Sequence, residues 1–213
     1  MEESNPYYES IEHDTIVFCL QQSQVVQPKE IAAFLLDSYS QPHRKYHNLT
    51  HIQSLLQHLS GIPADVSVDI QLLYLCIWFH DVYYDAQSQD NEERSAVEFA
   101  SCISNPVLRE SGRKMILSTK KHLPLLDTLD CKVFLDLDLS ILASTPQVYQ
   151  SYVQAIREEY SMFSQEDFWR GRLRVIKGFL QRPRLYFSKW GQESFAEQAY
   201  HNLNNEMQQL LGK

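Results

Sequence analysis

The chain has few of the residues that build sheets and turns. Only 6 of its 213 residues are glycine, and stretches in which β-branched and polar residues alternate are scarce. Apolar residues recur instead at spacings of three and four, the period of an amphipathic helix. The sequence therefore predicts an all-α fold, with about eight to ten helices by pattern alone.

Cysteine is also sparse, and long apolar runs are missing. The four cysteines contain no C-x-x-C pair and lie among apolar neighbours, which is typical of small core residues rather than of a disulfide framework. The longest apolar run, residues 72–79, is too short to span a bilayer. The first ten residues, MEESNPYYES, are acidic and polar, unlike a signal peptide. These observations favour a cytoplasmic protein with no membrane partner.

Positive charge is in the minority. Lysine and arginine number 19 against 27 acidic residues, and the formal net charge is −8. Nucleic-acid binding needs basic surface to meet phosphates, so no nucleic-acid partner is expected. A basic run between residues 170 and 184 is interpreted as a solvated face or a contact between copies, which leaves a homodimer open. A small phosphorylated substrate is compatible with this negative net charge, because a bound cation can make the local field positive.

Composition and pattern favour a single domain. Hydrophobic residues make up 44% of the chain, enough for a substantial core, and no stretch resembles a linker. We expect one unit over 1–213, with a site-bearing core of about 25–145 and C-terminal helices in 146–211 packed on it. Helices are expected at 29–39, 48–60, 65–80, 91–104, 111–122, 130–142, 146–160, 164–181 and 193–211. Asp90 and Glu93 predict a capping box before the fourth, and the apolar helix at 65–80 should be central and buried.

Two segments place histidine where it can do chemistry. In RKYHNLTH, residues 44–51, His47 and His51 are four apart and would share a helix face. If Asn48 is instead an N-cap, His47 lies in the preceding turn. In WFHD, residues 78–81, His80 and Asp81 end the buried helix. That placement is costly unless something pairs with them.

A third segment supplies carboxylates. FLDLDL, residues 134–139, holds Asp136 and Asp138 in apolar surroundings. Each segment alone has an ordinary structural interpretation, such as a hydrogen-bonded histidine or a helix-end aspartate. Together, imidazole and carboxylate groups suit a divalent metal such as Zn, Mn, Fe or Ni and leave positions for water and a substrate oxygen. The remaining isolated histidines are expected to be structural: His13, His43, His58 and His201.

These segments resemble a known family over most of the chain. YHNLTHI, IWFHDVYYD, DNEERSA and FLDLDLSIL, with REEY at 157–160 and GR at 171–172, look like a bacterial branch of predicted HD-superfamily phosphohydrolases. The resemblance implies an HD-type helical domain and a metal-dependent phosphohydrolase acting on a phosphomonoester or nucleotide-like small molecule. It implies one divalent ion (Zn, Mn, Fe, Ni or Mg) held by His51, His80, Asp81 and Asp138, with Asp136 as the alternative to Asp138.

The resemblance also suggests catalytic and substrate-binding residues. His47 matches a proton-donating histidine in the related YHNxxH pattern of cyclic-nucleotide phosphodiesterases, and an imidazole there could protonate a departing alkoxide. Carboxylates close after the His-Asp pair, Asp85 and Glu92, are candidates to position the attacking water. Phosphate contacts are expected from Arg94, Lys120, His122 and Arg157, and His122 could instead be an additional metal ligand.

Two other functions stay open at this stage. Some HD-like domains hold two irons and activate oxygen, which makes a di-iron oxygenase one alternative. A metal-binding regulatory module without catalysis is the other. A mononuclear hydrolase is favoured, because the sequence shows no complete second ligand set.

Overall fold

The computed structural model describes residues 11–212, and its regular structure is helical, which confirms the all-α prediction. The described range forms ten α-helices and one 3₁₀ helix: α1 (His13–Gln22), α2 (Pro28–Tyr39), α3 (Leu49–Ser60), α4 (Ile70–Phe79), α5 (Asn91–Cys102), α6 (Pro106–Thr119), α7 (Leu129–Asp138), η2 (Leu139–Ala143), α8 (Pro146–Glu159), α9 (Gln165–Leu180) and α10 (Lys189–Leu211).

Local capping explains where the helix boundaries differ from the predicted ones. α4 begins at residue 70 rather than 65, because Asp69 is its N-cap and accepts a hydrogen bond from Leu72 N. α6 begins five residues earlier than predicted, at Pro106, because Asn105 caps it. The prediction of a capping box at the start of α5 was wrong. Asp90 makes no cap hydrogen bond, and Glu93 pairs with Lys120 instead.

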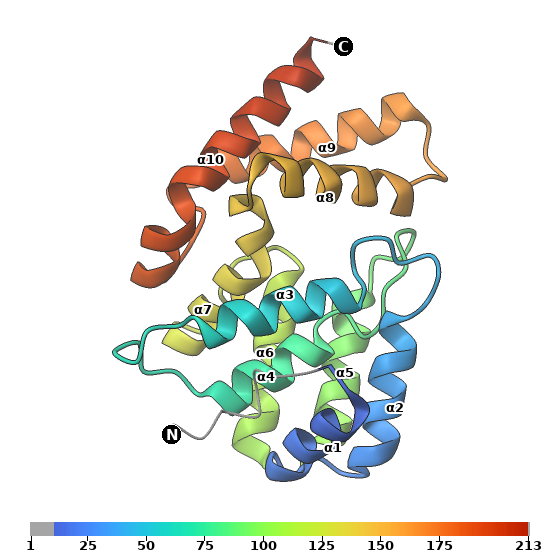
Figure 1. Ribbon diagram of the computed structural model, residues 1–213, viewed down its shortest axis with the longest axis vertical. Coiled ribbons are helices and arrows are strands. Elements are labelled where there is room, and N and C mark those ends of the chain that lie inside the picture. Colours follow the sequence, from blue (N-terminus) through green and yellow to red (C-terminus); the bar gives the residue numbers. More distant parts are fainter. Residues whose placement is uncertain (1–10, 213) are drawn as a thin grey trace.

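The helices form two tiers. Figure 1 shows α8, α9 and α10 lying above a larger body built from α1 to α7, with η2 in the connection between them. Each tier has its own cluster of buried apolar side chains, and Trp190 at the start of α10 packs against both. The chain therefore places its last three helices across the end of α7, next to the segments that carry the candidate ligands.

The predicted central helix is confirmed. Every residue of α4 from Leu72 to Phe79 is buried, and α4 contacts α3, α5, α6 and α7. The four cysteines are free and buried, as expected of small core residues. This packing holds the end of α4, and with it His80, deep inside the larger body.

The basic run in α9 is only partly a solvated face. Arg172 is 8% exposed, and its Nε and Nη2 donate to the two carboxylate oxygens of Glu206 in α10 at 2.8 and 3.0 Å. Arg182 donates to the carbonyl oxygens of Lys121 and His122 at 2.7 and 2.9 Å. The sequence-based interpretation was wrong for these two arginines, because each satisfies partners in another segment.

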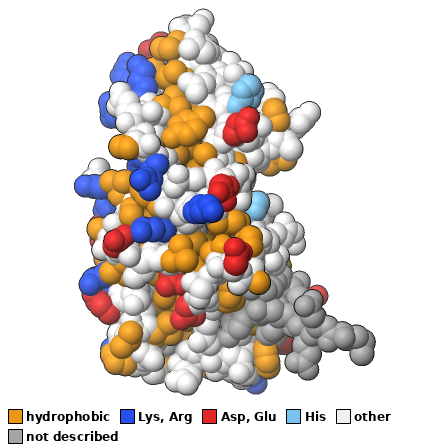
Figure 2. Space-filling view, turned by 90° about the vertical axis from the view of Figure 1, so that its left-hand side faces the viewer, with side chains coloured by type: hydrophobic (Ala, Val, Ile, Leu, Met, Phe, Trp, Pro, Cys, Tyr) orange, Lys and Arg blue, Asp and Glu red, His pale blue; other side chains and the backbone are white. Residues whose placement is uncertain are grey.

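The surface and the helix lengths agree with the charge and hydropathy patterns. Over residues 11–212, no helix combines the length and apolar character needed to cross a membrane. On the face drawn in Figure 2, acidic, basic and hydrophobic side chains are interspersed.

The close approach of α5 and α6 depends on Gly112. A Cβ at this position would lie 2.1 Å from Phe99 Cζ, whereas a Cβ at Gly178 in α9 would meet nothing within 4 Å. We expect Gly112→Ala to lower the free energy of unfolding by about 1–3 kcal/mol through overpacking. Gly178→Ala should raise it by up to about 1 kcal/mol through helix propensity. Urea unfolding measures both, and equal changes in the two variants would contradict this packing.

Candidate metal centre

His51 enters the site from the first turn of α3. Asn48 is the N-cap, and its side chain accepts a hydrogen bond from Thr50 N at 2.9 Å. This resolves the alternative left by the sequence, because His47 then lies in the turn before the helix. His51 is 5% exposed and faces the end of α4.

His80 is held at the end of α4 with one nitrogen turned into the site. Its Nδ1 lies 2.9 Å from the carbonyl oxygen of Ile77, to which it donates as the protonated nitrogen. When the ring is neutral, that hydrogen bond leaves Nε2 as the lone-pair nitrogen, the arrangement commonly found for metal-ligating histidines. Nε2 lies 3.3 Å from His51 Nε2 and 3.1 Å from Asp81 Oδ2.

Three of the four predicted ligands form one group, and the fourth, Asp138, approaches the two histidines. Single ligand atoms of His51, His80 and Asp81 lie within 4.8 Å of one another. Asp138 Oδ1 approaches both histidine Nε2 atoms at 3.5 Å from the end of α7. Two nitrogen ligands about 2.1 Å from one ion, at angles of 90–110°, would be roughly 3.0–3.4 Å apart. The spacing of the two histidines fits a shared ion.

The charges of the cluster also fit a cation. Burial lowers the pKa of His51, and it acts in the same direction on His80. The neighbouring carboxylates Asp81 and Asp138 outweigh burial at His80 and raise its pKa well above the usual value. Burial opposes ionisation of both aspartates, but the adjacent imidazoles hold their pKa values below the usual range. The buried Asp138 and the half-buried Asp81, beside two facing imidazole nitrogens, form a donor set that a divalent cation can satisfy.

Asp136 has a different role from Asp138. Its Oδ1 accepts a hydrogen bond from Phe187 N at 2.7 Å, and its Oδ2 accepts from Ser188 N and Ser188 Oγ at 2.8 and 2.6 Å. Burial raises its pKa to about 6. Asp136 therefore ties α7 to the start of α10, and Asp138 is the aspartate that reaches the histidines.

His122 adds an imidazole at the edge of the cluster. Its Nε2 lies 3.2 Å from Asp138 Oδ2, the oxygen turned away from His51 and His80, and 29% of its side chain is exposed. The residue has a positive φ of 45°, and its carbonyl oxygen accepts the hydrogen bond from Arg182. Of the four residues predicted to contact substrate, His122 is the one that touches a candidate ligand.

Glu159 is the main residue that the sequence analysis missed. It lies at the end of α8 and is 5% exposed. Its Oε1 accepts from Tyr46 N and His47 N at 2.8 and 2.9 Å, and its Oε2 accepts from His47 Nδ1 and the Tyr84 hydroxyl at 2.7 and 2.9 Å. Glu159 lies three residues after the buried Ile156, so the helical period places its charge on the apolar face of α8. This charged residue at an apolar position was the signal in the sequence that could have identified Glu159.

The pair of His47 and Glu159 is electrostatically coupled. Burial opposes ionisation of Glu159, but hydrogen bonds and charge from His47 lower the pKa of Glu159 to about 2. Burial would lower the pKa of His47, yet Glu159 and the nearby Asp81 raise it. The His47 ring also stacks on Tyr84 at 4.1 Å between centroids. His47 therefore stands oriented beside the cluster with a protonated form favoured.

Arg44 holds the two ligand-bearing loops together. Its guanidinium is buried and donates from Nη1 to Asp81 O at 2.6 Å and from Nη2 to Val82 O at 2.8 Å. Nη1 also donates to His47 O at 3.4 Å. The role of Arg44 was not predicted, because hydrogen bonds from one buried side chain to three carbonyl oxygens leave no periodic pattern in the sequence.

The remaining predicted residues make contacts outside the cluster. Asp85 is exposed and accepts from Gln87 N, and Glu92 lies half-buried near Lys120. Arg94 lies 4.3 Å above the ring of Tyr83. The other two basic groups serve nearby backbone: Lys120 donates to Gln89 O, and Arg157 donates to Tyr160 O and Phe163 O.

Comparison of the chain with family models, curated proteins and solved structures finds no match. The candidate centre is therefore defined by its residues alone.

The two aspartates of α7 give a matched test of the ligand assignment. We expect Asp138→Asn to weaken divalent-metal binding about 100-fold or more, because it removes a charged ligand. Asp136→Asn should leave that affinity within a few-fold, and should lower the free energy of unfolding by about 1–3 kcal/mol through unpaired donors. Calorimetric titration with Mn²⁺ and urea unfolding measure the two effects. The reverse pattern would make Asp136 the ligand.

The pair of His47 and Glu159 predicts a pH window of stability. Ionised Glu159 stabilises the fold fully above its unfolded pKa of about 4.3, and this contribution is lost as pH falls through about 2. Protonated His47 contributes fully below about pH 6.5 and loses its contribution as pH rises through its raised folded pKa. Glu159→Gln should therefore cost most, on the order of 3 kcal/mol, between about pH 4.5 and 6.5.

Urea unfolding of wild type and Glu159→Gln at pH 3, 5.5 and 8 measures this difference. The neighbouring Glu158, which is exposed, provides the control Glu158→Gln. A cost for Glu159→Gln that is the same at all three pH values would contradict the coupling.

Proposed function

We propose that the chain is an HD-type, metal-dependent phosphohydrolase that acts on a phosphomonoester or nucleotide-like small molecule. The observation that carries this proposal is the group of His51, His80 and Asp81, with Asp138 Oδ1 next to both histidines. On an ion that prefers six ligands, such as Mn²⁺, two imidazoles and two carboxylates leave two positions for water and a substrate oxygen, whereas they would fill a tetrahedral Zn²⁺ site.

The metal would be held by the ends of three helices. A divalent ion at this position supplies Lewis acidity, which neutralises charge on a phosphoryl oxygen and lowers the pKa of water. His51 and His80 would present their Nε2 atoms, and Asp81 and Asp138 their carboxylates. Arg44 fixes the backbone that carries Asp81, and so it serves as a positioning residue.

His47 is suited to donate a proton to the leaving group. Its Nδ1 is occupied by Glu159 at 2.7 Å, so Nε2 is the nitrogen left to face a substrate. The raised pKa keeps the ring protonated closer to neutral pH than an ordinary histidine. A general acid of this kind contributes typically 10²–10⁴-fold to a rate, with the donor lying near a departing oxygen.

Of the four residues proposed from sequence to contact phosphate, His122 is the one that we retain. Arg94, Lys120 and Arg157 are engaged with Tyr83, Glu93 and backbone carbonyls, respectively. His122 borders the ligand Asp138 and is partly exposed. It is therefore the protein group best placed to meet a phosphoryl oxygen at the edge of the site.

One observation favours a second candidate, a di-iron oxygenase. Asp138 faces His51 and His80 with one oxygen and His122 with the other, as a carboxylate between two metals would. His122 contacts Asp138, whereas the other nearby imidazole, His47, is bound through Nδ1 to Glu159. A second metal would need further protein ligands, so the hydrolase is the better-supported proposal.

The hydrolase proposal predicts loss of activity when single ligands are removed. We expect His80→Ala and Asp81→Ala each to lower phosphatase activity about 100-fold or more, because the site loses metal affinity and charge. The measurement is a panel of phosphomonoesters and nucleotides with several added divalent metals. His58→Ala is the matched control, since His58 packs against Phe195 away from the cluster. Wild-type activity that survives both ligand changes would refute this mechanism.

A further inference from the structure

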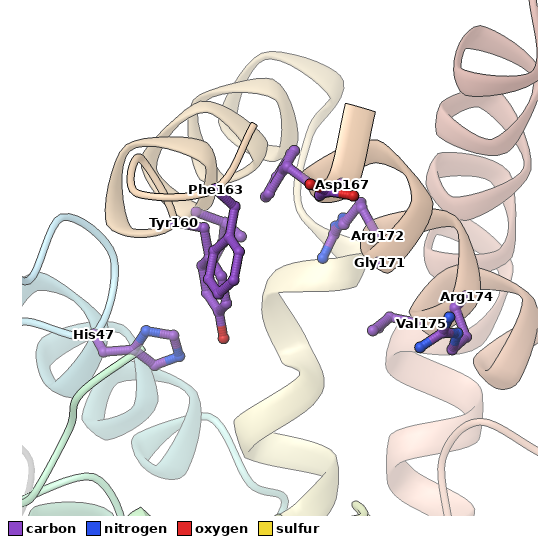
Figure 3. Close-up of a pocket in the computed structure, with 10 residues that line it drawn as sticks. His47, Tyr160, Phe163, Asp167, Gly171, Arg172, Arg174 and Val175 are labelled. Atoms are coloured by element: carbon purple, nitrogen blue, oxygen red, sulfur yellow. The ribbon is translucent and has the colours of Figure 1, made fainter. Parts of the chain in front are cut away.

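A cavity of about 440 Å³ opens beside His47, between the two tiers. In Figure 3 the His47 ring points into this space, Tyr160 and Phe163 stand above it, and side chains of α9 form the opposite side. His47 is the residue that belongs both to the surroundings of the metal cluster and to this wall. A molecule in the cavity would therefore contact the proposed proton donor directly.

The wall of the cavity is mostly apolar and aromatic. Apolar and aromatic side chains come from the end of α8, the loop after it and α9, and they are Ile156, Tyr160, Phe163, Phe168 and Val175. Such a surface stabilises a flat ring or hydrocarbon group by burying it. It penalises a hydroxyl-rich group, whose polar atoms would lose water without gaining partners.

Besides His47, three charged residues line the wall, and two of them are already paired. Arg172 is bound to both oxygens of Glu206 and to the Tyr152 hydroxyl. Asp167 accepts from Ser164 Oγ and from Arg170. Neither charge is available to a ligand without breaking an existing contact.

Arg174 is the exception. Its side chain is exposed and makes no hydrogen bond or ion pair with any residue between 11 and 212. Figure 3 places it on the α9 side of the cavity, across from His47. The cavity thus offers a proton donor at one end, an apolar middle and one uncommitted cation at the other end.

We propose that this cavity binds the leaving group of the substrate, and that this group is an aromatic ring system bearing an anionic substituent on its far side. The proposal rests on the hydrolase function above and narrows its substrate to an aromatic phosphomonoester. The volume lies within the roughly 300–1,000 Å³ typical of small-molecule pockets. Polyhydroxylated sugar phosphates are disfavoured by the same wall.

Binding of non-hydrolysable probes tests the apolar wall. We expect Mn²⁺-loaded wild type to bind 1-naphthylphosphonate at least 10-fold more tightly than methylphosphonate in calorimetric titration. Val175→Trp fills the cavity from an exposed position, and should reduce this ratio to near one. Val97→Trp, at another exposed helix position outside the cavity, should keep the ratio. A ratio near one in wild type, or an unchanged ratio in Val175→Trp, would overturn the proposal.

A second pair of variants tests the cation. A carboxylate on the distal ring of the naphthyl probe should tighten binding to wild type about 10-fold, and Arg174→Gln should remove that gain. Lys177→Gln, on the same helix but not in the wall, should retain it. A carboxylate that adds no affinity, or a gain that persists in Arg174→Gln, would show that Arg174 does not hold the far end of the ligand.

Titration of metal-free protein with neutral 1-naphthol separates this proposal from the hydrolase function. One outcome is that 1-naphthol binds wild type but not Val175→Trp, and that neither phosphonate binds the Mn²⁺-loaded protein. In that case the cavity assignment stands and the hydrolase proposal fails. If methylphosphonate binds with metal and 1-naphthol does not bind at all, the hydrolase proposal stands and the cavity assignment fails. Thermal unfolding of each variant confirms that it is folded.

Discussion

The rest of the structure depends on one constraint, the close approach of two buried imidazole nitrogens. His51 Nε2 and His80 Nε2 lie 3.3 Å apart. Two such atoms cannot both point lone pairs at each other in a protein interior without a proton or a cation between them. Asp81 and Asp138 approach the same point and favour positive charge there. The buried α4 and the caps of α3 and α7 keep these groups in place.

The upper tier contributes to this site as well as covering it. Glu159 at the end of α8 orients His47, Arg182 after α9 holds the carbonyl of His122, and Asp136 joins α7 to the start of α10. Each contact joins the last third of the chain to a segment that carries or borders a candidate ligand. The cavity is lined by His47 of the larger body and by residues of α8, α9 and the loop between them, so the same packing that completes the fold also forms the proposed leaving-group pocket.

The sequence predicted the fold class and the positions of most helices, because apolar periodicity and capping are local. The ligand set His51, His80, Asp81 and Asp138 was proposed on resemblance and donor chemistry, and the structure brings these residues together while leaving their metal binding to experiment. Glu159 and Arg44 were missed, since their partners lie 112 and 37 residues away in the chain. Arg172 and Arg182 were assigned to a solvated face for the same reason. Their partners are distant in the chain and cannot be identified from the spacing of residues.

The central claim is that one divalent ion sits among His51, His80, Asp81 and Asp138. Anomalous diffraction from crystals grown with Mn²⁺, with metal content measured in solution, tests it most directly. The account predicts one anomalous peak within coordination distance of all four side chains and one ion per chain. A peak elsewhere, two ions per chain, or no ion bound at saturating metal would contradict it.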